Sequence, residues 1–307
     1  MSRRKKGQRV HGWVVLDKPL AMGSTPAVSK VRHLFQAQKA GHAGTLDPLA
    51  SGILPVALGE ATKTVPWLMD AQKVYRFTVR WGVETTTLDG EGEPCAHSDV
   101  RPAPQAVQRA LAGFLGTISQ TPPAYSAIRV DGARAYDLAR AGETVMLEPR
   151  EVVIHEAEVV GANEHQAEIR IRSGKGVYVR SLARDLAHAL GTLGHVTQLR
   201  REQVGPFTLE DAIGFEALSQ LEQAGELEGA LLPLHAACES LPELVISEAD
   251  AADLRLGRSL LVTPSRMEGL RAQLGEDRQC LAMTGDEAVA IGEVRAGRFQ
   301  PTRVFQP

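Results

Sequence analysis

The residue whose type and surroundings most clearly suggest catalytic chemistry is a single carboxylate, Asp47. It lies in the stretch GHAGTLDPLASG at positions 41–52. Pro48 fixes its own φ and disfavours a helical conformation for Asp47, and the glycines of the stretch allow a backbone or a ligand to approach closely. A carboxylate held in such a turn, without other metal-ligand side chains, suits nucleophilic or acid–base catalysis. The same residues also fit an Asx-type turn or a helix N-cap, which is the more frequent role of Asp before proline.

Two arginines could act on such a carboxylate. Arg180 and Arg184 are four residues apart in a predicted helix, so they lie on one face of it. An arginine beside a carboxylate favours its ionised form. Both could equally be solvated surface residues. Nearby, Lys175 lies between two glycines and could contact a phosphate.

Tyr75 and His42 could contact a nucleic-acid base. Tyr75 begins the apolar face of an alternating segment, VYRFTVRW, at positions 74–81. Its ring could belong to the core or stack on a base, and such stacking contributes about 1–3 kcal/mol. His42 could contact a phosphate or stack on a base, or it could simply be hydrogen-bonded in place.

The sequence excludes several kinds of site. It has no GxxxxGK[ST] phosphate loop, no GxGxxG, no HExxH, no GxSxG and no Cys/His cluster at zinc spacing. The three cysteines, Cys95, Cys238 and Cys280, are far apart and form neither a CxxC pair nor a disulfide framework, which favours a reducing cytoplasm. There is no run of about 18 apolar residues that would predict a membrane span.

The elements that must position these residues are a mixture of strands and helices. Residues 24–26, Ser-Thr-Pro, predict a helix start with a hydroxyl cap. A turn at 173–176 precedes a helix whose leucines recur every four residues until Gly191. Apolar patterns predict strands at 12–19, 74–81, 151–160 and 167–172, an apolar segment at 53–58 and a further helix at 106–116.

Charge is distributed unevenly along the chain. The formal net charge is −3, but residues 1–205 carry 26 Lys+Arg against 20 Asp+Glu, and residues 206–307 carry 8 against 17. A basic larger part suggests a polyanionic partner, although chance clustering gives the same asymmetry. Changes in character predict a basic flexible arm at 1–11, a main domain at 12–240 that ends in an acidic helical segment at 208–235, and a small β-rich module at 241–307.

Several long motifs together resemble the TruB family of tRNA pseudouridine synthases. In order, they are GWVVLDKP, GHAGTLDPLASGILPVALGEATK, KVYRFTVRWGVETTTLDGEG, TPPAYSAIRVDGARAYDLARAG, SGKGVYVRSLARDLAHALG and HVTQLRR. The similarity is collinear from about residue 12 to 205 and continues, more weakly, to a C-terminal segment that resembles a PUA-type RNA-binding module. Two loops depart from the family pattern: residues 85–87 read Thr-Thr-Thr without the aspartate often found there, and the turn before Tyr178 reads SGKG.

The resemblance implies an α+β pseudouridine synthase fold, with helices flanking a central mixed, mostly antiparallel sheet and a small PUA-like domain after it. It implies an isomerase that flips uridine 55 in the T arm of tRNA out of its stack and converts it to pseudouridine, without a cofactor or a metal. It further implies a monomeric cytoplasmic enzyme with no membrane association and no obligatory protein partner. A tRNA-binding or folding protein with the same fold, and a guide-RNA-dependent relative, are the alternatives.

The resemblance also implies roles for individual residues. Asp47 would be the nucleophile, Arg180 would pair with it and Tyr75 would stack on the target base. These roles favour the catalytic interpretation of Asp47 and Tyr75 over the structural one. The other implied site residues are His42, which would help to reorganise the T loop, Lys63, which would be structural or substrate-facing, and Tyr178 and Leu199, which would line the pocket.

Overall fold

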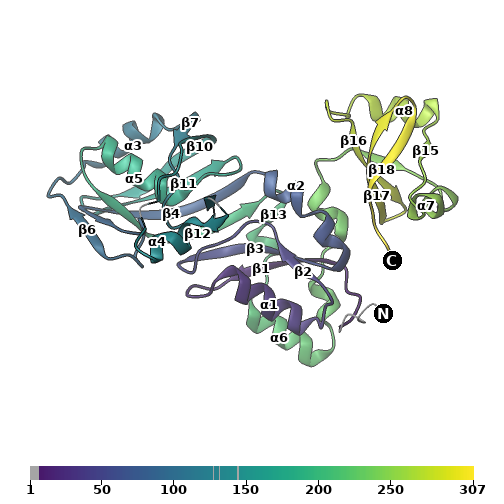
Figure 1. The fold of residues 1–307 in the computed structure, drawn as a ribbon, viewed down its shortest axis with the longest axis horizontal. Coiled ribbons are helices and arrows are strands. Elements are labelled where there is room, and N and C mark those ends of the chain that lie inside the picture. Colours follow the sequence, from purple (N-terminus) through teal and green to yellow (C-terminus); the bar gives the residue numbers. More distant parts are fainter. Residues whose placement is uncertain (1–6, 127, 131, 144) are drawn as a thin grey trace.

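The computed structural model describes residues 7–126, 128–130, 132–143 and 145–307 of the chain. A long sheet carries helices on its faces, and the C-terminal residues form a smaller module beside one end of it (Figure 1). The α+β fold expected from the sequence is therefore confirmed. Residues 1–6 of the expected basic arm lie outside the described residues. The rest of that segment contacts the main domain, since the Gln8 N–H donates to the Gln36 carbonyl at 2.7 Å.

The main sheet has nine strands in the order β1-β3-β12-β4-β11-β10-β7, with β2 beside β3 and β13 beside β12. Among its described strand pairs, β12 and β3 run parallel and the others antiparallel. Its strands are β1 (Gly12–Lys18), β2 (Ala40–His42), β3 (Ala50–Leu58), β4 (Lys73–Trp81), β7 (Gly116–Gln120), β10 (Arg150–Ala162), β11 (Gln166–Ser173), β12 (Gly194–Val204) and β13 (Phe207–Thr208). Two short hairpins pair β5 (Val83–Thr85) with β6 (Pro94–His97), and β8 (Arg129–Val130) with β9 (Ala133–Arg134).

Helices bury the apolar faces of this sheet. Leu182 and Leu186, at the predicted helical spacing, pack with Phe77 and Val79 of β4 in one buried cluster. The other half of the sheet packs on α1 and α6, and Leu218 of α6, in the acidic segment, is buried in this cluster. The helices of this part are α1 (Ser24–Leu34), α2 (Val65–Asp70), α3 (Pro104–Ala112), α4 (Ala135–Arg140), α5 (Val179–Ala189) and α6 (Phe215–Ala224), with 3₁₀ turns at Gly59–Lys63, Leu209–Asp211, Leu227–Ala230 and Leu234–Cys238.

The start of α1 differs from the predicted hydroxyl cap. Gly23 is the N-cap and offers no side chain. The Ser24 hydroxyl instead donates to the Leu46 carbonyl at 2.9 Å and accepts the Leu46 N–H at 2.8 Å. A hydroxyl that a local rule assigns to the helix end therefore ties α1 to the turn that contains Asp47.

The C-terminal module has a sheet and a core of its own. Its five strands follow the order β14-β16-β17-β18-β15. Leu254, Val289 and Phe299 are buried inside it. Its elements are β14 (Glu243–Val245), α7 (Glu248–Arg255), β15 (Leu260–Leu261), α8 (Pro264–Arg271), β16 (Gln279–Thr284), β17 (Glu287–Arg295) and β18 (Arg298–Val304).

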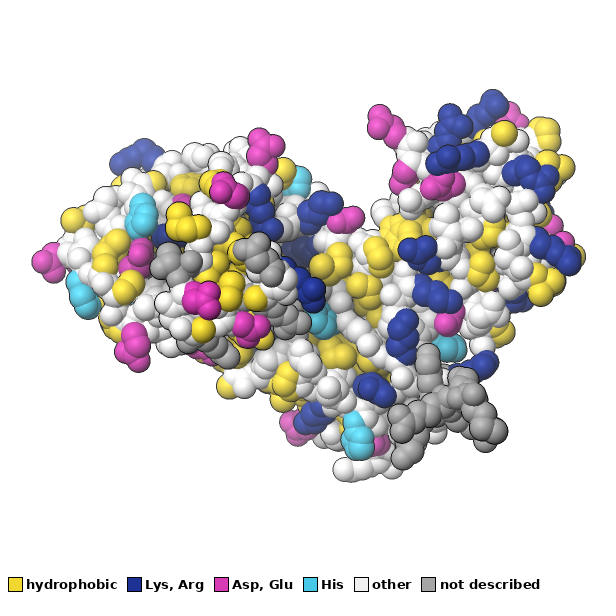
Figure 2. Space-filling view, viewed as in Figure 1, with side chains coloured by type: hydrophobic (Ala, Val, Ile, Leu, Met, Phe, Trp, Pro, Cys, Tyr) yellow, Lys and Arg dark blue, Asp and Glu magenta, His cyan; other side chains and the backbone are white. Residues whose placement is uncertain are grey.

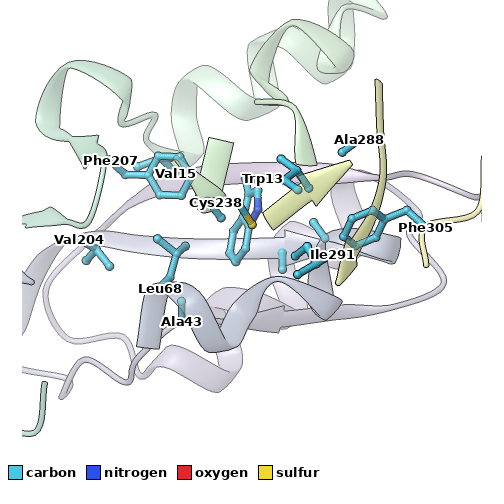
Figure 3. Packing of buried hydrophobic residues seen from close by; sticks show 14 of the residues in the cluster. Trp13, Val15, Ala43, Leu68, Val204, Phe207, Cys238, Ala288, Ile291 and Phe305 are labelled. Carbon is cyan, nitrogen blue, oxygen red and sulfur yellow. The ribbon is translucent and has the colours of Figure 1, made fainter. Parts of the chain in front are cut away.

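The module is joined to the main domain by a shared hydrophobic cluster. Trp13 of β1 and Leu68 of α2 belong to the same buried cluster as Ile291 of β17 and Phe305 after β18, with Cys238 among them (Figure 3). These side chains are no more than 4 % exposed. Because burying large apolar side chains is strongly favourable, the two parts pack as a continuous structure and not as loosely tethered domains.

Candidate active site

The turn that carries Asp47 is held from several directions. The guanidinium of Arg201, on β12, donates from Nε to the Ile53 carbonyl at 2.8 Å and from Nη2 to the Gly44 carbonyl at 3.1 Å. Arg201 is only 1 % exposed, and this burial lowers the pKa of its guanidinium, against an opposing interaction with Tyr75. Together with the Ser24 hydroxyl, these contacts fix the backbone on both sides of the carboxylate.

A glycine lets β3 approach β12 closely beside this turn. Gly52 has φ +97°, and a Cβ placed there would lie 2.2 Å from the Arg201 carbonyl oxygen. Any side chain would therefore separate the two strands whose parallel pairing aligns Leu199 with Ala50. Gly52 of this stretch thus serves a close approach between two backbones.

Asp47 forms an ion pair with Arg180 of α5. Arg180 Nη2 lies 2.8 Å from Asp47 Oδ2, and the arginine side chain is 7 % exposed whereas the aspartate side chain is 39 % exposed. Asp47 therefore has one oxygen held by a buried cation while its side chain remains accessible. The Asp47 side chain thus forms an ion pair with Arg180, whereas an Asx turn or a helix N-cap would direct it to a nearby backbone N–H.

Arg180 is itself held by three further groups. Nη1 donates to the Thr87 carbonyl and Nη2 to the Tyr125 carbonyl, both at 2.9 Å. Nε lies 3.5 Å from Asp89 Oδ2, a carboxylate that is 6 % exposed. Asp89 in turn accepts the Thr87 hydroxyl and the Glu91 N–H. The guanidinium is thus locked in one orientation before any substrate arrives.

A pocket of about 360 Å³ opens over this ion pair. The strands β4 and β12 form one wall, and the turn 174–178 that leads into α5 forms another. Five of the seven residues implied by the family resemblance lie in its lining: Asp47, Tyr75, Tyr178, Arg180 and Leu199.

Tyr75 and Tyr178 approach the pocket from different elements. Tyr75 is partly exposed and packs against the hydrophobic cluster of β4 and α5. Gln120 holds the backbone of Tyr178, accepting its N–H at 2.8 Å and donating to its carbonyl at 3.2 Å. The Arg150 guanidinium lies 5.0 Å from the centre of the Tyr178 ring. Two aromatic rings are therefore available beside one carboxylate.

The other two implied residues, His42 and Lys63, are not among the pocket-lining residues. His42 lies on β2, where burial and the charge of Arg201 lower the pKa of its imidazole, so the neutral form is favoured. Lys63 Nζ contacts Glu60 Oε2 at 2.5 Å and donates to the Val304 carbonyl at 2.7 Å. The structure thus places Lys63 between the main domain and β18.

Two further lysines near the site are buried. Lys18 donates to the Pro19 and Met22 carbonyls, and burial lowers its pKa to about 8, against the opposing charge of Asp47. Lys73 donates to the carbonyls of Leu68, Met69 and Ala71 at the end of α2, and burial likewise lowers its pKa to about 8. Neither lysine forms an ion pair with Asp47 among the described contacts.

The sequence did not single out several residues that build this site. Asp89, Arg150 and Arg201 carried no individual prediction. Arg184, predicted on the same face as Arg180, is bound to Asp185 and to the Thr121 carbonyl instead. Lys175 pairs with Asp70 at 2.9 Å.

No group of three or more His, Cys, Asp or Glu side chains among the described residues is arranged to hold a metal ion. Within the same ranges, no helix combines the length and apolar character needed to cross a membrane.

Comparison with known proteins agrees with this geometry. Solved structures with the same fold include a Cbf5–Nop10–Gar1 complex, with 26 % sequence identity, a TM-score of 0.74, and coverage of 97 % of this chain and 85 % of that one. A chain from an H/ACA ribonucleoprotein bound to a substrate RNA matches with a TM-score of 0.74 at 23 % identity, covering 100 % of this chain and 92 % of that one. The fold is that of a pseudouridine synthase.

The sequence comparisons narrow this class to one family. The model of the TruB family pseudouridylate synthase N-terminal domain matches residues 32–179, and that of the tRNA pseudouridylate synthase B C-terminal domain matches residues 180–239. Relatives named tRNA pseudouridine synthase B are 54 % identical in Caulobacter sp. strain K31, over 100 % of this chain and 99 % of that protein, and 51 % identical in Paracoccus denitrificans, over 98 % of each. The chain belongs to the TruB family of pseudouridylate synthases, as its motifs indicated.

Proposed function

We propose that this pseudouridine synthase acts on tRNA and isomerises uridine 55 of the T arm, with Asp47 as the nucleophile. The observation that carries the proposal is the Arg180–Asp47 ion pair at the wall of a pocket that also holds Tyr75 and Tyr178. The names of the full-length relatives support tRNA as the substrate.

The reaction begins with extrusion of the uridine, because the glycosidic carbon of a stacked base is unreachable. Extrusion costs a few kcal/mol, and stacking of the flipped base on Tyr75 offsets part of that cost. Leu199 and Tyr178 supply further contact area around the base. His42, behind the turn, would help to reorganise the T loop.

Asp47 then attacks either uracil C6 or ribose C1′ as a carboxylate. The bond between N1 and C1′ breaks, the uracil turns within the pocket, and a new bond forms between C5 and C1′. The C5 proton leaves to a base, for which the Tyr75 oxygen is our candidate, and N1 takes up a proton. The bond to Asp47 breaks in the same sequence, which regenerates the carboxylate. Substrate and product are isomers, so the reaction needs no electron donor, electron acceptor or energy source.

Arg180 supports this chemistry by position and by charge. Its guanidinium is anchored to two backbone carbonyls and to Asp89, so it holds Asp47 Oδ2 in a fixed place. A preorganised cation costs no reorganisation when the carboxylate attacks. Arg180 also stabilises Asp47 again when the aspartate leaves.

The rest of the chain would bind the RNA. The main part of the sequence is basic, with six more Lys and Arg than Asp and Glu over residues 1–205. Dark blue Lys and Arg side chains gather over the hollow between the main domain and the C-terminal module in Figure 2. We infer that this face and the PUA-like module from about residue 241 contact the tRNA backbone, and that binding weakens with salt.

The first test uses the purified protein and a tRNA transcript that carries tritium at C5 of its uridines. We expect release of one tritium per transcript by the wild type, and none by Asp47→Asn. A transcript with cytidine in place of uridine 55 should release none either.

The possible failures are separable. Tritium release from the cytidine-55 transcript would overturn the T-arm assignment and leave the isomerase activity intact. Binding of the wild type without tritium release would overturn action on bare tRNA, and a folding role or a required guide RNA would take its place. Release by Asp47→Asn would exclude Asp47 as the nucleophile.

A further inference from the structure

Arg150 is a pocket residue whose contacts no step of the proposed reaction uses. It is the first residue of β10 and lines the pocket together with Asp47 and Tyr75. Its Nη2 donates to the Gly176 carbonyl at 2.7 Å. Its guanidinium also packs on the Tyr178 ring at 5.0 Å, within the range of a cation–π contact.

Most of the donor capacity of this guanidinium is unused. An arginine has five N–H donors, and the Gly176 carbonyl takes one of them. Nε is buried and has no hydrogen-bond partner among the described residues. Arg150 as a whole is partly exposed, so the Nη donors that the Gly176 carbonyl does not take are available to a group that arrives with the substrate.

The other cations of the pocket are already occupied. Arg180 holds Asp47 and Asp89, and Arg201 and Lys73 are directed at backbone carbonyls. Lys175, at the rim, is paired with Asp70. Arg150 forms no ion pair with a carboxylate among the described residues, so it is the pocket cation with charge and donors left for a ligand.

The substrate supplies an anion near this position. A nucleotide turned out of a helix or loop carries a phosphate on each side of its ribose, and both move with it toward the pocket mouth. The planar fork of an arginine matches two phosphate oxygens better than a lysine ammonium does. Tyr178, held at its backbone by Gln120, places its ring 5.0 Å from the guanidinium.

We propose that Arg150 is a substrate-positioning residue that binds a backbone phosphate flanking the extruded uridine and, through Tyr178, fixes one side of the base pocket. The proposal rests on the function proposed above. It assigns recognition of the RNA backbone to the strand β10 and leaves Asp47 and Arg180 as the groups that act on the base.

The test compares Arg150→Gln and Arg150→Lys with the wild type in the tritium-release assay over a range of KCl concentrations. For Arg150→Gln we expect KM to rise about tenfold, with kcat within about threefold of the wild type, because a charged hydrogen bond is lost from binding. The slope of log KM against log salt should fall by about 0.7–0.9, which corresponds to one phosphate contact. Arg150→Lys should keep the wild-type slope and show an intermediate KM.

Arg109→Gln is the matched control, because Arg109 is an exposed arginine at the end of α3 and forms no ion pair among the described residues. It should leave KM and the salt slope unchanged. Equal shifts in both glutamine variants would mean a general charge effect and overturn the proposal. A lower kcat for Arg150→Gln with an unchanged KM and an unchanged slope of log KM against log salt would also overturn the proposal. If the wild type itself releases no tritium, the proposed function fails, but the role of Arg150 can still be tested. The Kd of the transcript for the same variants over the same salt range then replaces KM in the comparison.

Discussion

Arg180 Nη2 is 2.8 Å from Asp47 Oδ2, and the Nε of the same guanidinium is 3.5 Å from Asp89 Oδ2. One buried arginine therefore connects an accessible carboxylate in the pocket with a carboxylate that is almost completely enclosed. The arrangement leaves Asp47 accessible from the pocket, whereas Asp89 holds the arginine from the other side.

The first prediction concerns Arg180→Lys. A lysine carries the same charge but cannot reach Asp47, Asp89 and the two carbonyls with one ammonium group. We expect kcat to fall by about 100-fold or more, the loss typical of a misplaced reacting group. Single-turnover tritium release at saturating enzyme measures this step, with transcript binding as the control. A variant with wild-type single-turnover rates would show that Arg180 does not position the nucleophile.

The second prediction concerns Asp89→Asn. The amide has the same shape but no charge, so Arg180 loses one anchor while Asp47 keeps its partner. We expect kcat to fall by roughly tenfold with KM unchanged, because the interaction lost acts on the catalytic pair and not on the RNA. Asp70→Asn is the control, since Asp70 is exposed and pairs with Lys175 at the rim. Equal losses in both variants would contradict a specific role for Asp89.

The sequence indicated the residues on which the proposed chemistry rests, but not the residues that hold them in place. The alternation along 74–81 predicted a strand, and the leucine spacing before Gly191 predicted a helix. Both elements are found, because the burial pattern of each is set by residues close together in the chain. The strand β12 carried no such prediction, because its polar run Thr-Gln-Leu-Arg-Arg-Glu lacks an apolar alternation. Its Arg201 is nevertheless buried, since the carbonyls of a distant turn accept its hydrogen bonds.

Ser24 also shows that a local sequence rule does not predict a tertiary hydrogen-bond partner. A local rule assigned its hydroxyl to the start of a helix, but tertiary contacts assign it to Leu46, 22 residues away. Partners that are far apart in the chain cannot be deduced from local preference. Asp47, Tyr75 and Arg180 could be predicted because they lie in long family motifs. The residues that hold them could be identified only from the fold.

The third prediction concerns Gly52→Ala. The Cβ would lie 2.2 Å from the Arg201 carbonyl oxygen, and φ is in the left-handed region, so both sterics and backbone conformation oppose the change. We expect a loss of at least about 2 kcal/mol in the free energy of unfolding, measured by denaturant titration. Gly161→Ala is the control, because a Cβ there meets no atom within 4 Å. Similar stabilities for the two variants would contradict the close approach of β3 and β12.

The last prediction concerns the link between the main domain and the C-terminal module. Burial raises the pKa of the Glu60 carboxyl, but hydrogen bonds from Lys63 and from the Gln306 N–H outweigh it, so the pKa lies below its usual value of 4.5. Protonation of the Glu60 carboxyl therefore weakens its hydrogen bonds with Lys63 and the Gln306 N–H. Their stabilisation is fully present above about pH 4.5 and is lost as the pH falls through the lowered value.

Glu60→Gln should accordingly lower the Tm by roughly 2 °C at pH 7, because a partly exposed ion pair contributes little. The difference from the wild type should persist at pH 5 and shrink below pH 4.5, where the wild-type carboxyl also becomes neutral. Thermal unfolding at pH 7, 5 and 3.5 measures it. Glu228→Gln, in the acidic segment and without a described ion pair, is the control. A Tm difference that stayed constant down to pH 3.5 would mean that the packing of Glu60, and not its charge, connects β18 to the main domain.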